Sequence, residues 1–255
     1  MELHKSGDIF FCSPTGHDLE YVRAVAEAVL AQYDGRGPKW RPPESEWMWP
    51  VSLGGRAGVL GVRIDGRTSC VKLFYDERVR TKVRVALGAS KGRRAYRHGL
   101  RLTEAGIPCP RMLGYAERRP FGPAMLFTEL AADAVRFDLW AQKHAVPREV
   151  VVAMGRFVRR LHDRGISHAD LSPRNILLRP TDPAGGFLLL DYEDARFGRR
   201  VSRRTGLNNL HHLHERVVGY VPLRARLHFL RTYAPEDYLA TRDALRRMMA
   251  KSGTC

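Results

Sequence analysis

An ordered run of polar residues behind an amphipathic helix is the feature that most limits what this chain can fold into. Apolar residues recur at helical spacing over 148–164, and Gly165 favours the end of a helix there. The sequence then reads Gly-Ile-Ser-His-Ala-Asp-Leu-Ser-Pro-Arg-Asn and continues into two apolar runs, the second of which ends in Asp-Tyr-Glu. The polar members of this run are His168, Asp170, Asn175 and Asp191. This order indicates a helix, a loop and two short strands that belong to one unit.

The spacing of these polar residues suits phosphoryl transfer. Asn175 lies five positions after Asp170, and Asp191 lies 21 positions after it. One carboxylate can orient a hydroxyl and accept its proton, while amide and carboxylate oxygens can bind a Mg²⁺ ion that bridges nucleotide phosphates. Any one of these residues alone would be an ordinary loop residue that bonds its own backbone. The complete ordered set favours a phosphotransferase active site.

Short apolar runs separated by glycine predict an antiparallel sheet that begins near residue 50. The Asp65-Gly66 pair between two such runs is a hairpin signal, and Gly54, Gly55 and Gly58 lie in a loop before it. The strands are expected over 49–53, 59–64, 69–75, 112–117 and 125–130, with a helix over 89–105.

A small sheet followed by a helical body predicts the α+β class. Residues 1–45 are expected to form an accessory helix, over about 17–33, and a linker. We expect the sheet lobe over 46–130 and the helical lobe over 131–255.

The catalytic-type loop resembles that of the protein-kinase-like superfamily. More narrowly, the chain resembles the bacterial lipopolysaccharide core kinases, the Kdo and heptose kinase group, over roughly residues 50 to 235. The matching segments are His168-Ala-Asp-Leu-Ser-Pro-Arg-Asn-Ile-Leu-Leu178, Asp191-Tyr-Glu193, Glu104-Ala-Gly-Ile-Pro-Cys-Pro110, Asn208-Asn-Leu210 and Arg226-Leu-His-Phe-Leu-Arg-Thr-Tyr233.

The resemblance implies a two-lobed protein-kinase-like fold, with a small antiparallel β N-lobe and a mainly helical C-lobe, that uses ATP and Mg²⁺. It implies that Asp170 orients the acceptor hydroxyl, that His168 braces the loop and that Lys72 clamps the phosphates. The implied nucleotide-binding residues are Gly54, Gly55, Gly58, Lys72, Glu129 and Leu130, and the implied Mg²⁺ ligands are Asn175 and Asp191. The implied acceptor is a sugar hydroxyl of a lipopolysaccharide or related glycolipid core.

Two positions depart from the pattern of the superfamily. Ala95 stands where a helix carboxylate would pair with Lys72, and Ser172 stands where protein kinases carry a lysine after the catalytic aspartate. Because of Ala95, a second function stays open, that of a pseudokinase that binds nucleotide or serves as a scaffold without transferring phosphate. Ser172 argues against an ordinary protein kinase, although a protein Ser/Thr or a small molecule stays open as the acceptor.

The formal net charge of +16 predicts anionic partners. The twelve basic residues between 78 and 119 are Arg78, Arg80, Lys82, Arg84, Lys91, Arg93, Arg94, Arg97, Arg101, Arg111, Arg118 and Arg119, and a second group is Arg196, Arg199, Arg200, Arg203 and Arg204. Such groups suit a phosphorylated glycolipid or an anionic inner-membrane surface, or they are solvated helix faces. Nucleic acid is disfavoured because regularly spaced aromatics and a recognised binding module are absent from the sequence.

The remaining patterns concern location and metals. The sequence has no stretch of the length and apolar character that crosses a bilayer, and its first twenty residues lack the apolar core of a signal peptide. We therefore expect a cytoplasmic protein, and the basic groups leave open a peripheral location on the cytoplasmic face of the inner membrane. The four cysteines are scattered, so neither a zinc site nor a disulfide framework is expected. His211, His212 and His214 are expected to pack or to be exposed rather than to bind a metal.

Overall fold

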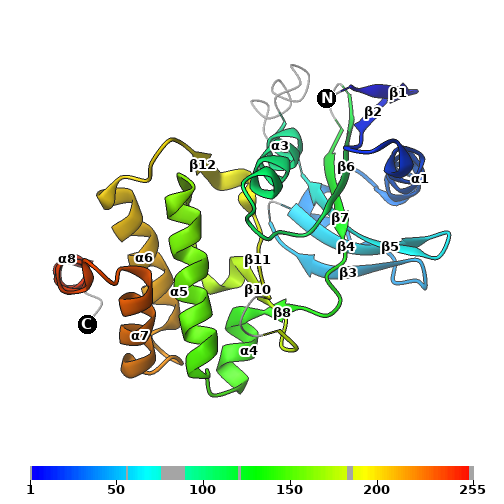
Figure 1. The fold of residues 1–255 in the computed structure, drawn as a ribbon. Helices are drawn as coiled ribbons and strands as arrows, with labels where there is room; N and C mark the ends of the chain where they lie inside the picture. The colour runs from blue at the N-terminus through cyan, green and yellow to red at the C-terminus, as the bar shows by residue number, and fades with distance from the viewer. Residues whose placement is uncertain (1, 56, 76–89, 120–121, 183–185, 253–255) are drawn as a thin grey trace. The chain divides into compact units, whose positions relative to one another are not determined.

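The chain divides into two compact units. Figure 1 shows its elements coloured by residue number, from blue at the N-terminus to red at the C-terminus. The computed structural model describes residues 2–55, 57–75, 90–119, 122–182 and 186–252. The first unit comprises residues 1–101 and 110–131, and the second comprises residues 102–109 and 132–255. The expected lobe boundaries at residues 45 and 130 stay a prediction.

A seven-stranded antiparallel sheet in the order β1-β2-β6-β7-β5-β4-β3 forms the first unit. Its strands are β1 (His4–Ser6), β2 (Ile9–Cys12), β3 (Met48–Leu53), β4 (Ala57–Ile64), β5 (Arg67–Phe74), β6 (Met112–Arg118) and β7 (Ala124–Glu129). Asp65 and Gly66 connect β4 to β5 with φ angles of 51° and 74°. Two successive positive φ angles are what a two-residue hairpin turn requires, so the predicted hairpin is confirmed.

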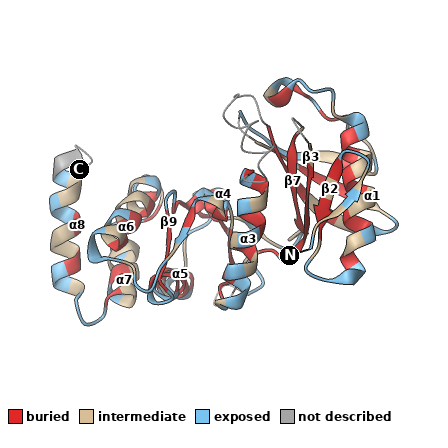
Figure 2. Cartoon of the chain, turned by 90° about the horizontal axis from the view of Figure 1, so that it is seen from above, coloured by how far each residue is buried: buried red, intermediate tan, exposed pale blue. Residues whose placement is uncertain are grey.

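Helix α1 (Gly16–Gln32) covers one face of this sheet and closes its core. Its Val22 and Val25 side chains are fully buried together with Val71 and Leu73 of β5. Figure 2 shows buried residues in red along the strands of this sheet and on part of α1. Because side chains alternate along a strand, Lys72 lies on the opposite face of the sheet.

Helix α3 (Lys91–Glu104) packs against that opposite face through two glycines. A Cβ atom on Gly92 would lie 2.9 Å from Cβ of Ala124, and one on Gly99 would lie 2.4 Å from Sδ of Met112. Ala95 is completely buried in this packing. The helix therefore approaches the sheet more closely than larger side chains at these positions would allow.

The second unit is mainly helical and contains two small antiparallel sheets. Its helices are α4 (Phe137–Lys143), α5 (Arg148–Asp163), α6 (Arg203–Val217), α7 (Leu223–Tyr233) and α8 (Tyr238–Ser252). Its strands are β8 (Val135–Arg136), β9 (Ile166–His168), β10 (Ile176–Leu178), β11 (Phe187–Leu189) and β12 (Ala195–Phe197), in the orders β11-β10-β8 and β12-β9. Short 3₁₀ turns are η2 (Pro173–Asn175) and η3 (Tyr192–Asp194) in this unit, and η1 (Gly37–Lys39) in the first. Helix α5 packs against α7, as Figure 1 shows.

The α+β class is confirmed, but the order of elements begins earlier than the sequence indicated. The sequence predicts α1 as the first element, whereas β1 and β2 precede it and extend the sheet along β6. The signal was weak because β1 has only three residues, His-Lys-Ser, without apolar alternation.

Four members of the first basic group lie outside the described residues, namely Arg78, Arg80, Lys82 and Arg84. Within the described ranges, no helix has the length and apolar character to cross a membrane.

Candidate active site

His168 ties the predicted catalytic loop to the segment that carries Asp191. The His168 side chain is buried at the end of β9, and its Nδ1 accepts the backbone N–H of Asp170 at 3.2 Å. Nδ1 is therefore unprotonated, and Nε2–H faces the backbone oxygens of Leu190 and Asp191 at 3.2 and 3.0 Å. The imidazole thus links the two segments, which fits the bracing role expected for it.

Asp170 and Asn175 are brought together by η2. Nδ2 of Asn175 donates to the backbone oxygen of Asp170 at 2.9 Å and to its carboxylate Oδ2 at 3.2 Å. Because the amide nitrogen makes both of these bonds, the amide oxygen of Asn175 is the atom that can bind a cation. The Asp170 side chain is 56% exposed, so its carboxylate is open to a substrate.

Asp191 follows β11 in an unusual backbone conformation. Its φ of 53° and ψ of 35° are left-handed, a region that aspartate tolerates better than most residues. The preceding Leu190 N–H donates to the backbone oxygen of Asn175 at 2.8 Å, which holds this segment next to η2. His168, Asp170, Asn175 and Asp191 thus form one cluster within the second unit.

Asn209 of α6 joins this site, although no pattern in the sequence assigns it there. Its side chain is buried and bonds both backbone groups of His168. Nδ2 of Asn209 donates to the backbone oxygen of His168 at 2.8 Å, and Oδ1 of Asn209 accepts from the backbone N–H of His168 at 3.3 Å. Oδ1 also accepts from Nε2 of His162 at 3.1 Å. The Asn208-Asn-Leu210 motif was the signal in the sequence, but nothing in the motif itself shows which segment it contacts.

Burial of His162 makes the stability of this unit depend on pH. Burial lowers the pKa of His162 from its ordinary value of 6.5, although the bond to Asn209 opposes the shift. Below about pH 6.5 the unfolded chain therefore binds a proton that the folded chain binds only at lower pH, and stability falls as pH falls. Above that pH the imidazole is neutral in both states and this dependence ends.

We predict that the free energy of unfolding, measured by urea titration, decreases from pH 7 to pH 5 and that His162→Gln has a smaller decrease. Burial and Arg226 also lower the pKa of His214, so some pH dependence persists in the variant. An equal slope in both proteins would contradict the assignment to His162.

Lys72 is the predicted phosphate-binding residue of the first unit. It pairs with Val59 of β4 on one side and with Leu126 of β7 on the other, in the middle of the sheet. Its side chain is partly buried, and Nζ lies 5.1 Å from the centre of the Phe74 ring. The lysine therefore lies on the sheet face away from α1, on a central strand rather than at an edge.

The glycine-rich loop before β4 is a tight turn. Gly54 N–H donates to the backbone oxygen of Ala57 at 3.0 Å, and Gly54 and Gly55 are exposed. The expectation that Gly58 lies in this loop is wrong, because Gly58 is buried within β4, where it pairs with Leu53 of β3 and Leu73 of β5. A Cβ on Gly58 would lie 2.2 Å from the Tyr75 hydroxyl, so packing in the first unit favours glycine there. Gly54 and Gly55 lie where their backbone is accessible to a ligand.

Glu129 and Leu130, the expected adenine-contacting residues, lie at the end of β7. The backbone N–H of Glu129 donates to the oxygen of Arg111 at 3.0 Å, and its carboxylate accepts from Nε of the same arginine at 2.8 Å. An adenine ring at this strand end would therefore meet the Glu129 carbonyl or the Leu130 backbone rather than the Glu129 N–H.

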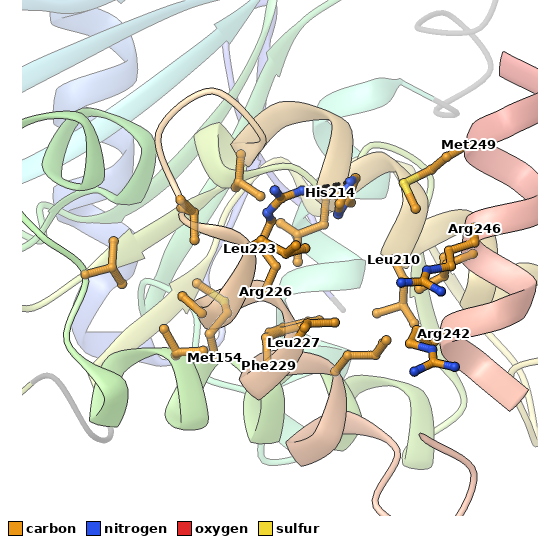
Figure 3. Close-up of a pocket in the computed structure, with 18 of the residues that line it drawn as sticks. Met154, Leu210, His214, Leu223, Arg226, Leu227, Phe229, Arg242, Arg246 and Met249 are labelled. Atoms are coloured by element: carbon orange, nitrogen blue, oxygen red, sulfur yellow. Dashed lines mark hydrogen bonds between the residues drawn. The ribbon is translucent and has the colours of Figure 1, made fainter. Parts of the chain in front are cut away.

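A separate apolar cavity lies among α4 to α8 of the second unit, and Figure 3 shows the side chains around it. Its volume is about 140 Å³, and it is partly open to solvent. Its walls include Met154, Leu210, Leu227 and Phe229, and Arg226, Arg242 and Arg246 add positive charge. Nη1 of Arg226 lies 3.1 Å from Nε2 of His214, and its buried Nε has no hydrogen-bond partner among the described residues.

The sequence has known relatives. The model of the lipopolysaccharide kinase (Kdo/WaaP) family matches residues 54–238. A 3-deoxy-D-manno-octulosonic acid kinase of Haemophilus influenzae (strain Rd) is 32% identical over 126 residues, which are 47% of this chain and 52% of the relative. The protein of the same name from Mannheimia succiniciproducens is 30% identical over 132 residues, 51% of this chain and 54% of the relative. This chain therefore spans about half the length of the curated relatives it matches.

Two solved structures share the fold. One is described as WaaP in complex with acyl carrier protein, with a TM-score of 0.63, 21% identity, and coverage of 94% of this chain and 98% of that chain. The other is an aminoglycoside-3'-phosphotransferase of type VIII, with a TM-score of 0.51, 19% identity, and coverage of 88% of this chain and 97% of that chain. At these identities the likeness concerns the fold, and it confirms the protein-kinase-like fold expected from the loop motif.

Proposed function

Because this chain belongs to the lipopolysaccharide kinase (Kdo/WaaP) family, we propose that it transfers a phosphoryl group from ATP to a sugar hydroxyl of a lipopolysaccharide or related glycolipid core. The proposed acceptor sugar is 3-deoxy-D-manno-octulosonic acid (Kdo), because relatives in two bacterial genera carry the name of a kinase for it.

The observation that supports this proposal most directly is the cluster around Asp170. The Asp170 carboxylate is open to solvent but held by the Asn175 amide, so it can orient an incoming hydroxyl and accept its proton. In the transfer, the hydroxyl oxygen bonds to the γ-phosphorus, the bond to the β-phosphate oxygen breaks and ADP leaves.

The residues of the same cluster fit a Mg²⁺ ion. Asn175 offers its amide oxygen and Asp191 follows β11 with an exposed carboxylate, and such oxygens are the ligands that Mg²⁺ prefers. When bound, the ion would neutralise charge on the nucleotide phosphates. Lys72 would hold those phosphates, and the exposed backbone of Gly54 and Gly55 would cover them.

The test combines acceptor phosphorylation with ATP binding. Purified protein, ATP and Mg²⁺ are incubated with a lipid A precursor that bears Kdo, and mass spectrometry should find one added phosphate on Kdo. By calorimetry, ATP should bind in the presence of Mg²⁺, and Asp191→Ala should weaken this binding by about tenfold or more because a metal ligand is lost. Asp163→Asn, which alters a surface ion pair with Arg159, is the matched control and should bind ATP as the wild type does.

Each failure of this test has a meaning. Absence of ATP binding would contradict the kinase proposal and favour a scaffold, in line with Ala95. ATP binding with phosphorylation of a protein or an aminoglycoside, but not of Kdo, would contradict the acceptor alone.

We further propose that acyl carrier protein is a partner and that its acyl chain enters the cavity among α4 to α8. The related structure is described as a complex with that protein, and the cavity has apolar walls suited to an aliphatic chain. The unpaired Nε of Arg226 would suit an anionic or carbonyl oxygen near the end of such a chain. An anionic membrane surface stays a second proposed partner because of the basic groups.

Acyl carrier protein loaded with a long acyl chain should bind at least about tenfold more tightly than the unacylated form in a calorimetric titration. Arg226→Gln should weaken binding of the acylated form by about tenfold, whereas Arg224→Gln, an exposed position on the same helix, should not. Equal affinities for the acylated and unacylated forms would contradict the role of the cavity.

A further inference from the structure

His212 of α6 lies against the carboxylate of Asp170. Its Nε2 is 3.2 Å from Oδ1 of Asp170, while the Asn175 amide bonds Oδ2 of the same group. The two oxygens are therefore held from two different elements, α6 and η2. The remaining lone pairs of the carboxylate stay on its open side, since this side chain is 56% exposed.

Helix α6 is well placed to hold the histidine there. Asn209 lies three residues earlier, so both side chains project from the same face of the helix. Asn209 is buried and bonded to both backbone groups of His168, which anchors this face to the loop that carries Asp170. On the other side of the imidazole, Nδ1 of His212 lies 3.9 Å from Oε2 of Glu215. The ring is thus placed by the helix rather than by a mobile loop.

The loop itself places no basic side chain two positions after Asp170. That residue is Ser172, whose side chain is buried. His212 supplies an N–H donor at the carboxylate from a part of the chain 42 residues away.

We propose that His212 is a positioning residue for phosphoryl transfer, which donates from Nε2 to Oδ1 of Asp170 and fixes the orientation of its carboxylate. This inference rests on the proposed function of Asp170 as the group that accepts the acceptor proton. The hydroxyl proton passes to the Asp170 carboxylate as the new oxygen–phosphorus bond forms and ADP leaves. His212 keeps its own proton and gains no bond to substrate or nucleotide.

Kinetics of phosphate transfer to a Kdo-bearing lipid A precursor test this role. His212→Ala should lower kcat by about 10- to 30-fold and leave the KM for ATP within about twofold, because a misplaced carboxylate slows the transfer without changing nucleotide contacts. His212→Gln carries an N–H donor at a similar reach and should recover most of the lost kcat. His211→Gln, which removes the neighbouring imidazole that meets Glu215, should keep kcat within about twofold.

An NMR measurement tests the contact independently of any turnover. The ¹⁵N chemical shifts of the His212 ring report which nitrogen bears hydrogen and what it bonds, and they should change in Asp170→Asn, whereas those of His211 should not. The cross-peaks of His212 are identified by their loss in His212→Gln.

The outcomes separate this inference from the proposed function. An active wild type with an inactive Asp170→Asn and a fully active His212→Ala would overturn the positioning role alone. Unchanged His212 shifts in Asp170→Asn would overturn it as well, even if no acceptor is phosphorylated. If no phosphate transfer is found but the His212 shifts change in Asp170→Asn as expected, the proposed function is contradicted and the contact between His212 and Asp170 is supported.

Discussion

Replacing Asp170 by asparagine is expected to lower kcat for phosphoryl transfer by about 10³-fold. Asparagine has nearly the same shape and can accept the Asn175 amide through its own oxygen, but it cannot take up the proton of the acceptor hydroxyl. The loss corresponds to about 4 kcal/mol of transition-state stabilisation. The measurement is the rate of phosphate incorporation at saturating ATP and acceptor.

The same variant should keep its affinity for ATP with Mg²⁺, because neither the expected Mg²⁺ ligands nor Lys72 is altered. Asp163→Asn is again the control, since it removes an exposed carboxylate of the same unit. Turnover of Asp170→Asn within about tenfold of the wild type would refute the assignment of Asp170 as the proton acceptor.

Replacing Gly165 by alanine is expected to destabilise the second unit by about 3 kcal/mol or more. Gly165 has a φ of +70°, which costs an L-residue about 1–2 kcal/mol. Its Cβ would lie 2.0 Å from the backbone oxygen of Gly198, so backbone must move. The affected segment runs directly into β9 and His168, and the unfolding midpoint should fall by about 6–12 °C.

Gly106→Ala separates the two causes of this effect. Gly106 has a φ of +67°, but its Cβ would meet no atom within 4 Å. It should therefore lose only about 1 kcal/mol, the conformational part of the cost. Equal losses in the two variants would contradict the clash with Gly198, and the midpoints of thermal unfolding measured by circular dichroism decide the question.

Local patterns in the sequence predicted most of the elements and the polar members of the loop. Neighbouring residues encode the Asp65-Gly66 turn, the helix over 148–164 and the strand that carries Lys72, through turn chemistry and hydrophobic period. The spacing of Asp170, Asn175 and Asp191 likewise lies within a short stretch of chain. These features could be predicted because their causes act over a few residues.

Contacts between distant segments could not be predicted in this way. Asn209 meets His168 across 41 residues and His212 meets Asp170 across 42, and no period or motif in α6 states which partner it faces. The N–H of Glu129 similarly donates to the backbone oxygen of Arg111, 18 residues away in the chain. The sequence by itself therefore predicted the members of the candidate site, His168, Asp170, Asn175 and Asp191. The tertiary structure alone decided which side chains orient them. The physical reason is that packing and hydrogen bonding between remote elements depend on the folded arrangement of the whole unit.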